Sequence, residues 1–114
     1  MIVRGDDAPT QPAEPGVVRQ VLGHDSELMM VRVTFEPGAE GYLHAHPHRQ
    51  VTYVERGRFE FTLGETRTTV SAGDCWFVPP GVLHGAVALE GGVLIDVFTP
   101  ARDEFLRESM KNEK

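Results

Sequence analysis

The class of fold is indicated by a stretch near the middle of the chain, Arg58-Phe59-Glu60-Phe61-Thr62-Leu63. Apolar and polar residues alternate strictly along it, and successive side chains of a β-strand point to opposite faces. The stretch therefore predicts a strand with Phe59, Phe61 and Leu63 on one buried face. Glycine-containing turn signals bound it on both sides, so this strand is expected to be short.

Similar runs, rich in Val, Thr, Tyr and Phe, lie on both sides of this stretch. Turn signals recur about every 8 to 12 residues, among them Gly57 and Glu90-Gly91-Gly92, and this spacing is typical of an all-β sandwich or small barrel. The predicted strands span residues 17–22, 28–35, 42–46, 51–55, 58–63, 67–71, 75–78, 85–89 and 93–98.

The pattern changes after residue 98. Thr99 and Pro100 supply a helix N-cap and a first-turn proline, and Phe105, Leu106 and Met110 recur at helical spacing. We therefore expect one short C-terminal helix packed on the barrel.

The composition is that of one globular domain. The chain has 114 residues, of which 40% are hydrophobic and 25% charged, and this length supports a single hydrophobic core. Residues 1–15 are rich in Pro and are expected to form a flexible N-terminal arm. Residues 16–114 are then expected to form the domain itself.

Charge and hydropathy bear on partners and location. The net charge of -6 argues against nucleic acid and anionic membranes, which favour a basic face. No run of 18 apolar residues is present and the first residues lack the apolar segment of a signal peptide, so a cytoplasmic protein is expected. The single Cys75 fits a reducing compartment, and its apolar neighbours Trp76 and Phe77 predict a buried, inert thiol.

Histidines are concentrated in two places, and this suggests a metal site. Three lie in His44-Ala-His46-Pro-His48-Arg-Gln50, and His84 follows a Pro-Pro-Gly turn. Imidazoles two residues apart on a strand share a face. Three imidazoles and one amide oxygen around an open position can form a catalytic metal site. The alternative is a histidine-rich surface loop; a tag remnant would lie at a terminus, not between two predicted strands.

Asp96 is the other candidate functional residue, because it interrupts an apolar run. Leu94, Asp96 and Phe98 share one strand face, and a buried carboxylate costs several kcal/mol unless it is paired or hydrogen-bonded. It is either an active-site group or a structural residue bonded to a loop or to Arg102. The guanidinium of Arg102 has the geometry to bind a substrate carboxylate, although taken alone Arg102 fits a surface or capping role better.

Two motifs in the chain resemble those of the cupin family. Gly73, Pro79, Gly81 and His84 match its second motif, while an Asn often found at its end is replaced by Ala88. The resemblance implies a single double-stranded β-helix, or jelly-roll barrel, with a metal near one mouth. The first motif is matched by Gly38, His44, His46, Gln50 and Gly57, and the implied metal ligands are His44, His46, Gln50 and His84.

Gln50 stands where the cupin motif usually has an acid. An amide oxygen cancels none of the metal's charge, which favours Lewis-acid activation of an anionic substrate oxygen. It also differs from the carboxylate-containing sites of non-haem iron oxygenases. The expected cofactor is one divalent transition metal ion, either Zn, Ni, Mn, Co or Fe. His48 is expected to line the pocket or to support the metal ligands from behind rather than to act as a fifth ligand, and Tyr42 shares the parity of His44.

A closer resemblance, over residues from about 18 to 106, is to the KdgF-type pectin-degradation cupins. It rests on residues 21–30, 44–50 and 94–102, and it includes the unusual glutamine. Members of this group convert 4,5-unsaturated monouronates from pectin or alginate into linear 4-deoxy keto-uronates. The resemblance implies a metal-dependent isomerase-type enzyme acting on a small-molecule uronate, with Asp96, Phe98 and Arg102 as catalytic residues.

Other functions of small cupins remain as alternatives. These are another sugar isomerase or epimerase, a metal-dependent dioxygenase, and a non-catalytic sugar-binding cupin. A homodimer is expected, because cupin barrels commonly pair through their sheets and an extended N-terminal arm can assist.

Overall fold

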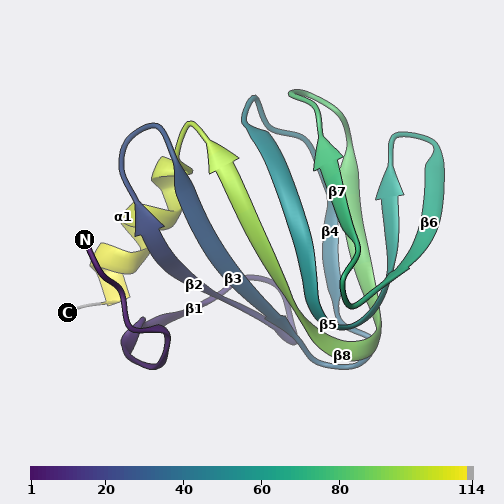
Figure 1. Cartoon of the computed structure of the whole chain (residues 1–114), viewed down its shortest axis with the longest axis horizontal. Helices are drawn as coiled ribbons and strands as arrows, with labels where there is room; N and C mark the ends of the chain where they lie inside the picture. The colour runs from purple at the N-terminus through teal and green to yellow at the C-terminus, as the bar shows by residue number, and fades with distance from the viewer. Residues whose placement is uncertain (113–114) are drawn as a thin grey trace.

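Antiparallel β-structure dominates the computed structural model, which describes residues 1–112 (Figure 1). The strand order is β1-β2-β3-β8-β5-β6, with β4 paired to β8 and β7 paired to β5. The predicted all-β fold with one short helix is confirmed. The elements are a 3-10 helix (Gly5–Asp7), β1 (Thr10–Pro12), β2 (Val17–His24), β3 (Met29–Phe35), β4 (Glu40–His44), β5 (Arg49–Leu63), β6 (Thr66–Ser71), β7 (Cys75–Val78), β8 (His84–Thr99) and α1 (Asp103–Asn112).

Two long strands, β5 and β8, each replace two predicted short strands, so the turns expected at Gly57 and at residues 90–92 are wrong. The chain bends at these places but stays paired, with register shifts between Val54 and Phe59. Gly57 has φ 91°, and a Cβ on it would lie 2.7 Å from the carbonyl oxygen of Gly91. These glycines therefore permit a bulged, close crossing of two strands, which the sequence signal cannot distinguish from a turn.

The bends divide the strands between two layers. The first part of β8 pairs with β4 and with the end of β5, whereas its second part pairs with β3 and with the beginning of β5. Figure 1 shows the resulting curl, with β1, β2, β3 and α1 on one side and β4, β6 and β7 on the other. A hollow between the layers follows from this arrangement, and the candidate site lies there.

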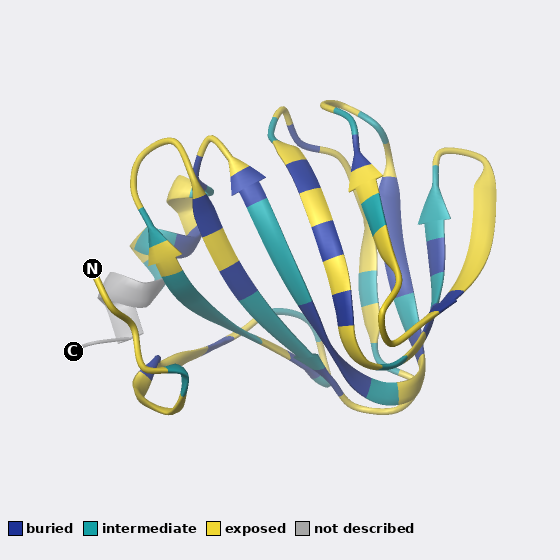
Figure 2. Cartoon of the chain, in the orientation of Figure 1, coloured by how far each residue is buried: buried dark blue, intermediate teal, exposed yellow. Residues whose placement is uncertain are grey.

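The core forms on the inward faces of the strands. Buried and exposed residues alternate along β5 (Figure 2), and Phe59 and Phe61 are buried as the alternation predicts. Phe59 meets Phe35 edge to face, with ring centroids 5.1 Å apart. A second buried cluster joins the sheet to α1 through Phe98 and Phe105, whose centroids are 5.9 Å apart.

The helix begins at Asp103, later than the predicted cap at Thr99. Thr99 is the last residue of β8 and is still paired with Arg49, so the sheet ladder overrides the local cap signal. Phe105 is buried and Leu106 is half-buried, as their spacing predicts. The side chain of Met110 lies outside the part of the chain whose side chains the structure describes.

Part of the expected arm contacts the domain. Residues 10–12 form β1, which pairs with β2. The Gln11 side chain is 1% exposed, and its Nε2 donates to the carbonyl oxygen of Phe105 at 2.9 Å. The boundary placed after residue 15 stays a prediction.

Cys75 is exposed, which corrects the expectation of a buried thiol. In β7 the inward residues are Trp76, which stacks on Phe61 with centroids 4.0 Å apart, and Val78. Because β7 is apolar on both faces, its alternation did not reveal which face is inward.

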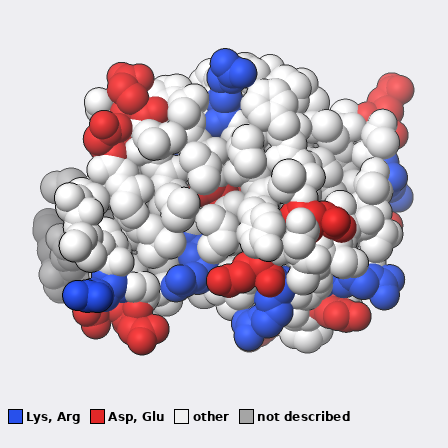
Figure 3. Space-filling model, in the orientation of Figure 1, with Lys and Arg blue, Asp and Glu red and all other residues white. Residues whose placement is uncertain are grey.

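The surface carries both signs of charge. On the face in Figure 3, acidic and basic side chains are interspersed around a largely uncharged centre. Within residues 1–112, no helix is long and apolar enough to cross a membrane.

Candidate functional site

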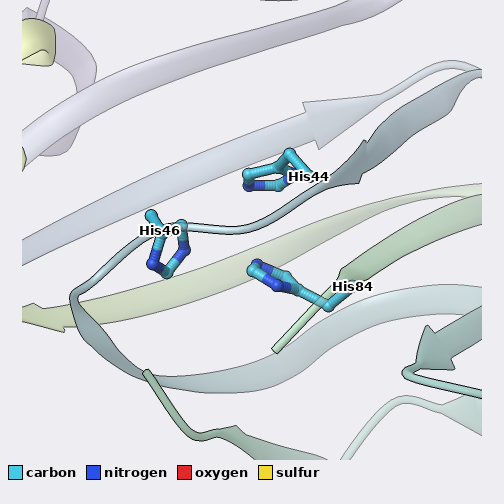
Figure 4. Close-up of side chains that lie close together, drawn as sticks. All are labelled: His44, His46 and His84. Carbon is cyan, nitrogen blue, oxygen red and sulfur yellow. The ribbon is translucent and has the colours of Figure 1, made fainter. Parts of the chain in front are cut away.

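Three of the predicted metal ligands meet between the layers. His44 ends β4, His84 begins β8 in register with it, and His46 lies in the loop that leads to β5. Their candidate ligand nitrogens all lie within 4.8 Å of one another, and Figure 4 shows the rings turned toward one another. Gly85 permits this approach, since a Cβ on it would lie 2.8 Å from the carbonyl oxygen of Gly41 on β4.

Backbone carbonyls orient all three rings. Because a carbonyl oxygen only accepts hydrogen bonds, the nitrogen facing it must carry the proton, and Nε2 of a neutral ring keeps its lone pair. Metal-binding histidines show this same arrangement. The contacts are His44 Nδ1 to Tyr42 O at 2.8 Å, His46 Nδ1 to His48 O at 3.2 Å, and His84 Nδ1 to Val82 O at 2.9 Å.

The Nε2 atoms of these rings have the surroundings expected of ligands to a cation. His84 Nε2 is buried and has no hydrogen-bond partner among the described residues. His46 Nε2 lies 3.0 Å from Gln50 Oε1, and both atoms offer lone pairs when Nδ1 carries the proton. Burial lowers the pKa of His84 to about 4 and also lowers that of His46, so both rings are neutral near pH 7. The three histidines are therefore able to bind a late first-row metal ion.

Gln50 is held in one orientation by two neighbours. Its Nε2 donates to Thr52 Oγ1 at 2.8 Å and to Asp96 Oδ1 at 3.4 Å, which leaves Oε1 facing His46. Thr52 Oγ1 in turn donates to Asp96 Oδ1 at 2.5 Å. A continuous polar network thus links the histidine cluster to the carboxyl group. Sequence reasoning missed Thr52, although it shares the inward parity of Gln50 on β5.

Asp96 has the properties of a group that exchanges a proton near neutral pH. It is partly buried on the inward face of β8, and burial raises its pKa to about 6, against the opposing effects of Thr52 and Arg102. Its hydrogen bonds are to Thr52 and Gln50, rather than to a loop or to Arg102 as the structural alternative supposed. A carboxyl group held beside a candidate metal site is well placed for acid–base chemistry.

One cavity of about 220 Å³ connects these groups. It also reaches Tyr42 near one mouth and the apolar residues Phe35 and Phe61 deeper inside. His46 and His48 do not line it; His48 acts on the site through its carbonyl oxygen, which orients His46. The predicted site residues that line the cavity are His44, Gln50, His84, Asp96, Phe98 and Arg102.

Arg102 is not a surface residue, since its side chain is only 11% exposed. Its guanidinium carbon lies 5.1 Å from the Phe98 ring centroid and 4.4 Å from that of Phe105, and its Nε donates to Glu104 at 3.2 Å. Sequence reasoning missed Arg19, a second arginine that lines the cavity. The only signal for it was its parity with Val17 on β2.

Comparisons with known proteins identify relatives of the whole domain. The cupin domain family matches residues 31–98. The pectin degradation protein KdgF of Dickeya dadantii (strain 3937) is 38% identical over 103 residues, covering 89% of this chain and 94% of that protein. Among solved structures, an RmlC-like cupin from Shewanella frigidimarina NCIMB 400 has a TM-score of 0.88 and 46% identity, covering 91% of this chain and 94% of its own. KdgF from Halomonas sp. has a TM-score of 0.88 and 39% identity, and the match covers 92% of this chain and 99% of the Halomonas chain.

Proposed function

The chain belongs to the cupin family, and we propose that it is a metal-dependent enzyme that converts 4,5-unsaturated monouronates into linear 4-deoxy keto-uronates. Its similarity to the KdgF proteins supports a role in pectin degradation. One observation carries the proposal: Asp96, Arg102 and two of the three clustered histidines, His44 and His84, line the same cavity. That cavity therefore combines a proton-transfer group, a candidate metal centre and a cation suited to a uronate carboxylate.

The metal centre would use four donors, three from strands and one from the loop between β4 and β5. A divalent transition metal ion, either Zn, Ni, Mn, Co or Fe, supplies Lewis-acid stabilisation of negative charge on substrate oxygens when bound. The amide of Gln50 leaves the full charge of the ion available for that purpose. The proposed ligands are His44, His46, Gln50 and His84.

The proposed reaction needs one proton to move and requires no oxidant. Ring opening transfers the proton of the anomeric hydroxyl to a base and breaks the bond from C1 to the ring oxygen, which leaves an aldehyde at C1 and an enolate at C4 and C5. Ketonisation then adds a proton at C4. The Asp96 carboxylate would accept the first proton and return it to C4, so that atoms and electrons balance in a net isomerisation. The hydrogen bonds from Thr52 and Gln50 hold this carboxylate in place.

Two further residues would bind and shield the substrate. Phe98, 2% exposed, forms an apolar wall beside Asp96 and would limit access of water to the enolate. Arg102 would bind the substrate carboxylate through two parallel hydrogen bonds. A homodimer in the cytoplasm, as the sequence predicts, is part of the proposal.

The test uses metal-analysed protein and unsaturated galacturonate freshly released by a pectin lyase. The absorbance of the double bond conjugated to the carboxylate should fall faster than the spontaneous rate. A chelator should abolish this acceleration and added metal should restore it. No acceleration by protein with a full complement of metal would overturn the proposal.

Asp96→Asn separates catalysis from assembly of the site. Turnover should fall by about 100-fold or more, while the variant stays folded and its metal content stays near that of the wild type. Glu65→Gln, which alters an exposed carboxylate in the β5–β6 turn, should retain wild-type turnover. Wild-type activity in Asp96→Asn would rule out Asp96 as the acid–base group.

Three other measurements distinguish the alternative functions. Oxygen uptake with a thiol or diol substrate would indicate a dioxygenase. Tight uronate binding without turnover would indicate a sugar-binding cupin. Conversion of a saturated sugar would indicate a different isomerase or an epimerase.

A further inference from the structure

Arg19 is a cation on the inward face of β2. It alternates with buried Val17, is paired in register with Val33 of β3, and lines the same cavity as Asp96 and Arg102. The mechanism above does not use it. Placing a charged side chain on the inward face of a strand is unfavourable unless a partner compensates.

The guanidinium of Arg19 has few partners within the described residues. It forms no ion pair there, and its one hydrogen bond runs from Nη1 to Gln11 Oε1 at 3.4 Å. A guanidinium has five N–H donors, so most of them remain available. Burial lowers the pKa of Arg19, and the charge of Glu14, which also lines the cavity, opposes this effect without forming an ion pair.

Its position is fixed despite these open donors. Gln11 is 1% exposed and is tied to α1 by the hydrogen bond from its Nε2 to Phe105 O at 2.9 Å. Its Oε1 is thereby aimed at Arg19 from the neighbouring strand β1. The Arg19 guanidinium carbon also lies 4.0 Å from the Phe105 ring centroid, a cation–π contact.

Arg19 and Arg102 share this aromatic ring. The guanidinium carbon of Arg102 lies 4.4 Å from the Phe105 centroid, so two like charges lie close together within one cavity. The positive charge of each arginine destabilises the positive charge of the other. A bound anion would relieve that repulsion, and the planar fork of a guanidinium matches a carboxylate.

We propose that Arg19 is a second carboxylate-binding residue that, together with Arg102, selects acidic sugars over neutral ones. The identity of the acid as an unsaturated uronate rests on the proposed function. In such a substrate the carboxylate is attached to C5, so its capture by the two arginines would hold the neighbouring C4 within the cavity that Asp96 lines.

Kinetics with the acid and its methyl ester test this role. Arg19→Gln should raise KM for the unsaturated uronate by about tenfold or more and change kcat by less than about threefold. With the methyl ester, which has no negative charge, wild type and Arg19→Gln should have similar kcat/KM. Arg58→Gln, at an exposed arginine paired with Glu90, is the matched control and should behave as wild type with both substrates.

Two further variants distinguish a loss of carboxylate binding from a general effect on folding. Arg19→Lys keeps the charge but not the fork, and its KM should fall between those of wild type and Arg19→Gln. Arg19→Met keeps an apolar stem against Phe105 and should show the Arg19→Gln kinetics. Equal losses with acid and ester in these variants would show that Arg19 only packs, and would overturn the inference.

Direct binding separates this inference from the proposed reaction. By titration calorimetry, the metal-loaded protein should bind galacturonate more tightly than methyl galacturonate ester, and Arg19→Gln should remove that preference. A preference that depends on Arg19, without turnover of unsaturated uronate, would support the inference while refuting the proposed reaction. If the protein turns over unsaturated uronate but Arg19→Gln keeps the preference for the acid over the ester, the inference is refuted and the proposed reaction is not.

Discussion

The Gln50 amide makes two kinds of contact at the candidate site, one through its oxygen and one through its nitrogen. Its oxygen faces His46 at 3.0 Å, while its nitrogen donates to Thr52 and Asp96. A glutamate offers oxygens to a metal but has no N–H to donate. The amide therefore lets one side chain join a candidate metal ligand set and also orient a carboxylate.

Gln50→Glu should retain metal more strongly but turn over more slowly. The added negative charge favours a cation, whereas losing both donated hydrogen bonds and placing a second carboxylate beside Asp96 disturbs the proton-transfer group. We expect turnover to fall by about tenfold or more. Metal content after chelator treatment and kcat measure the two effects. Unchanged kcat would contradict the role assigned to the Gln50 amide.

Asp96→Asn should stabilise the chelator-treated protein near pH 7 more than near pH 4. Burial raises the folded-state pKa of Asp96 from 3.8 to about 6, so the folded protein binds this proton more tightly than the unfolded chain. Wild type therefore loses stability as the pH rises from 3.8 through about 6, and asparagine does not. The difference in unfolding free energy between Asp96→Asn and the wild type should therefore grow by roughly 1–3 kcal/mol as the pH rises over this range.

His84 contributes in the opposite direction but does not affect that gap. Burial lowers its pKa from 6.5 to about 4, so stability is lost as the pH falls from 6.5 through about 4. This loss is common to wild type and Asp96→Asn and cancels in their difference. Denaturant titrations at the two pH values provide the measurement. A gap of equal size at both would contradict the burial of Asp96.

Among the strands, β8 contributes most to the site. His84 lies at its beginning, and Asp96 and Phe98 lie near its end. On a straight strand His84 and Asp96 would be roughly 40 Å apart. The bend at Gly91 and Gly92 carries β8 from one layer to the other, so both ends face one cavity. The site therefore depends on the continuity of this strand.

Gly85→Ala should weaken metal binding by separating β4 from β8. The added Cβ would lie 2.8 Å from the backbone oxygen of Gly41, which cannot move without displacing the strand that ends in His44. We expect a loss of roughly 1–3 kcal/mol in stability and a lower metal content. Gly23→Ala is the control, because a Cβ there meets nothing within 4 Å. Normal metal content in Gly85→Ala would refute this account.

At the scale of the whole molecule, one outer face remains apolar. It lies on β3, β8, β5 and β7, where registered pairs join Met30 to Val97, Val97 to Val51, and Val51 to Phe77. Met30, Val51 and Phe77 are 42%, 44% and 43% exposed. A contiguous apolar face of this kind is typical of a protein–protein interface.

The proposed occupant of this face is a second copy of the chain. Arg49 and Glu55 lie exposed on the same face of β5, on either side of Val51 and Tyr53. If two β5 strands pack antiparallel about a two-fold axis, the Arg49 end of each meets the Glu55 end of the other. Apolar contact at the centre and opposite charges on its flanks favour this homodimer.

Val51→Lys should therefore convert the protein to a monomer. Light scattering during gel filtration measures the mass, and a lysine at the centre of the apolar face would be desolvated without a partner. Leu89→Lys is the control, since Leu89 is 45% exposed on a different part of β8. A dimeric Val51→Lys variant, or a monomeric wild type, would refute the proposed interface.

The strands, the histidine cluster and the inward direction of Asp96 could be predicted from the sequence, because each produces a local pattern. Period-two alternation defines a strand face wherever one face is polar, as in residues 58–63. The cupin motifs place the histidines at spacings that the barrel brings together. Where a strand is apolar on both faces, as around Cys75, the alternation carries no such information and the prediction was wrong.

Only the tertiary structure decided which distant residues share the cavity. Arg19 and Thr52 carry no motif, and they reach the site because barrel closure places β2 and β5 around it. The continuity of β5 and β8 through their glycines is likewise a result of strand crossing. Sequence patterns report the face that a residue occupies along its own strand. Which residues meet across the cavity depends on contacts between segments far apart in the chain, and these form only when the barrel closes.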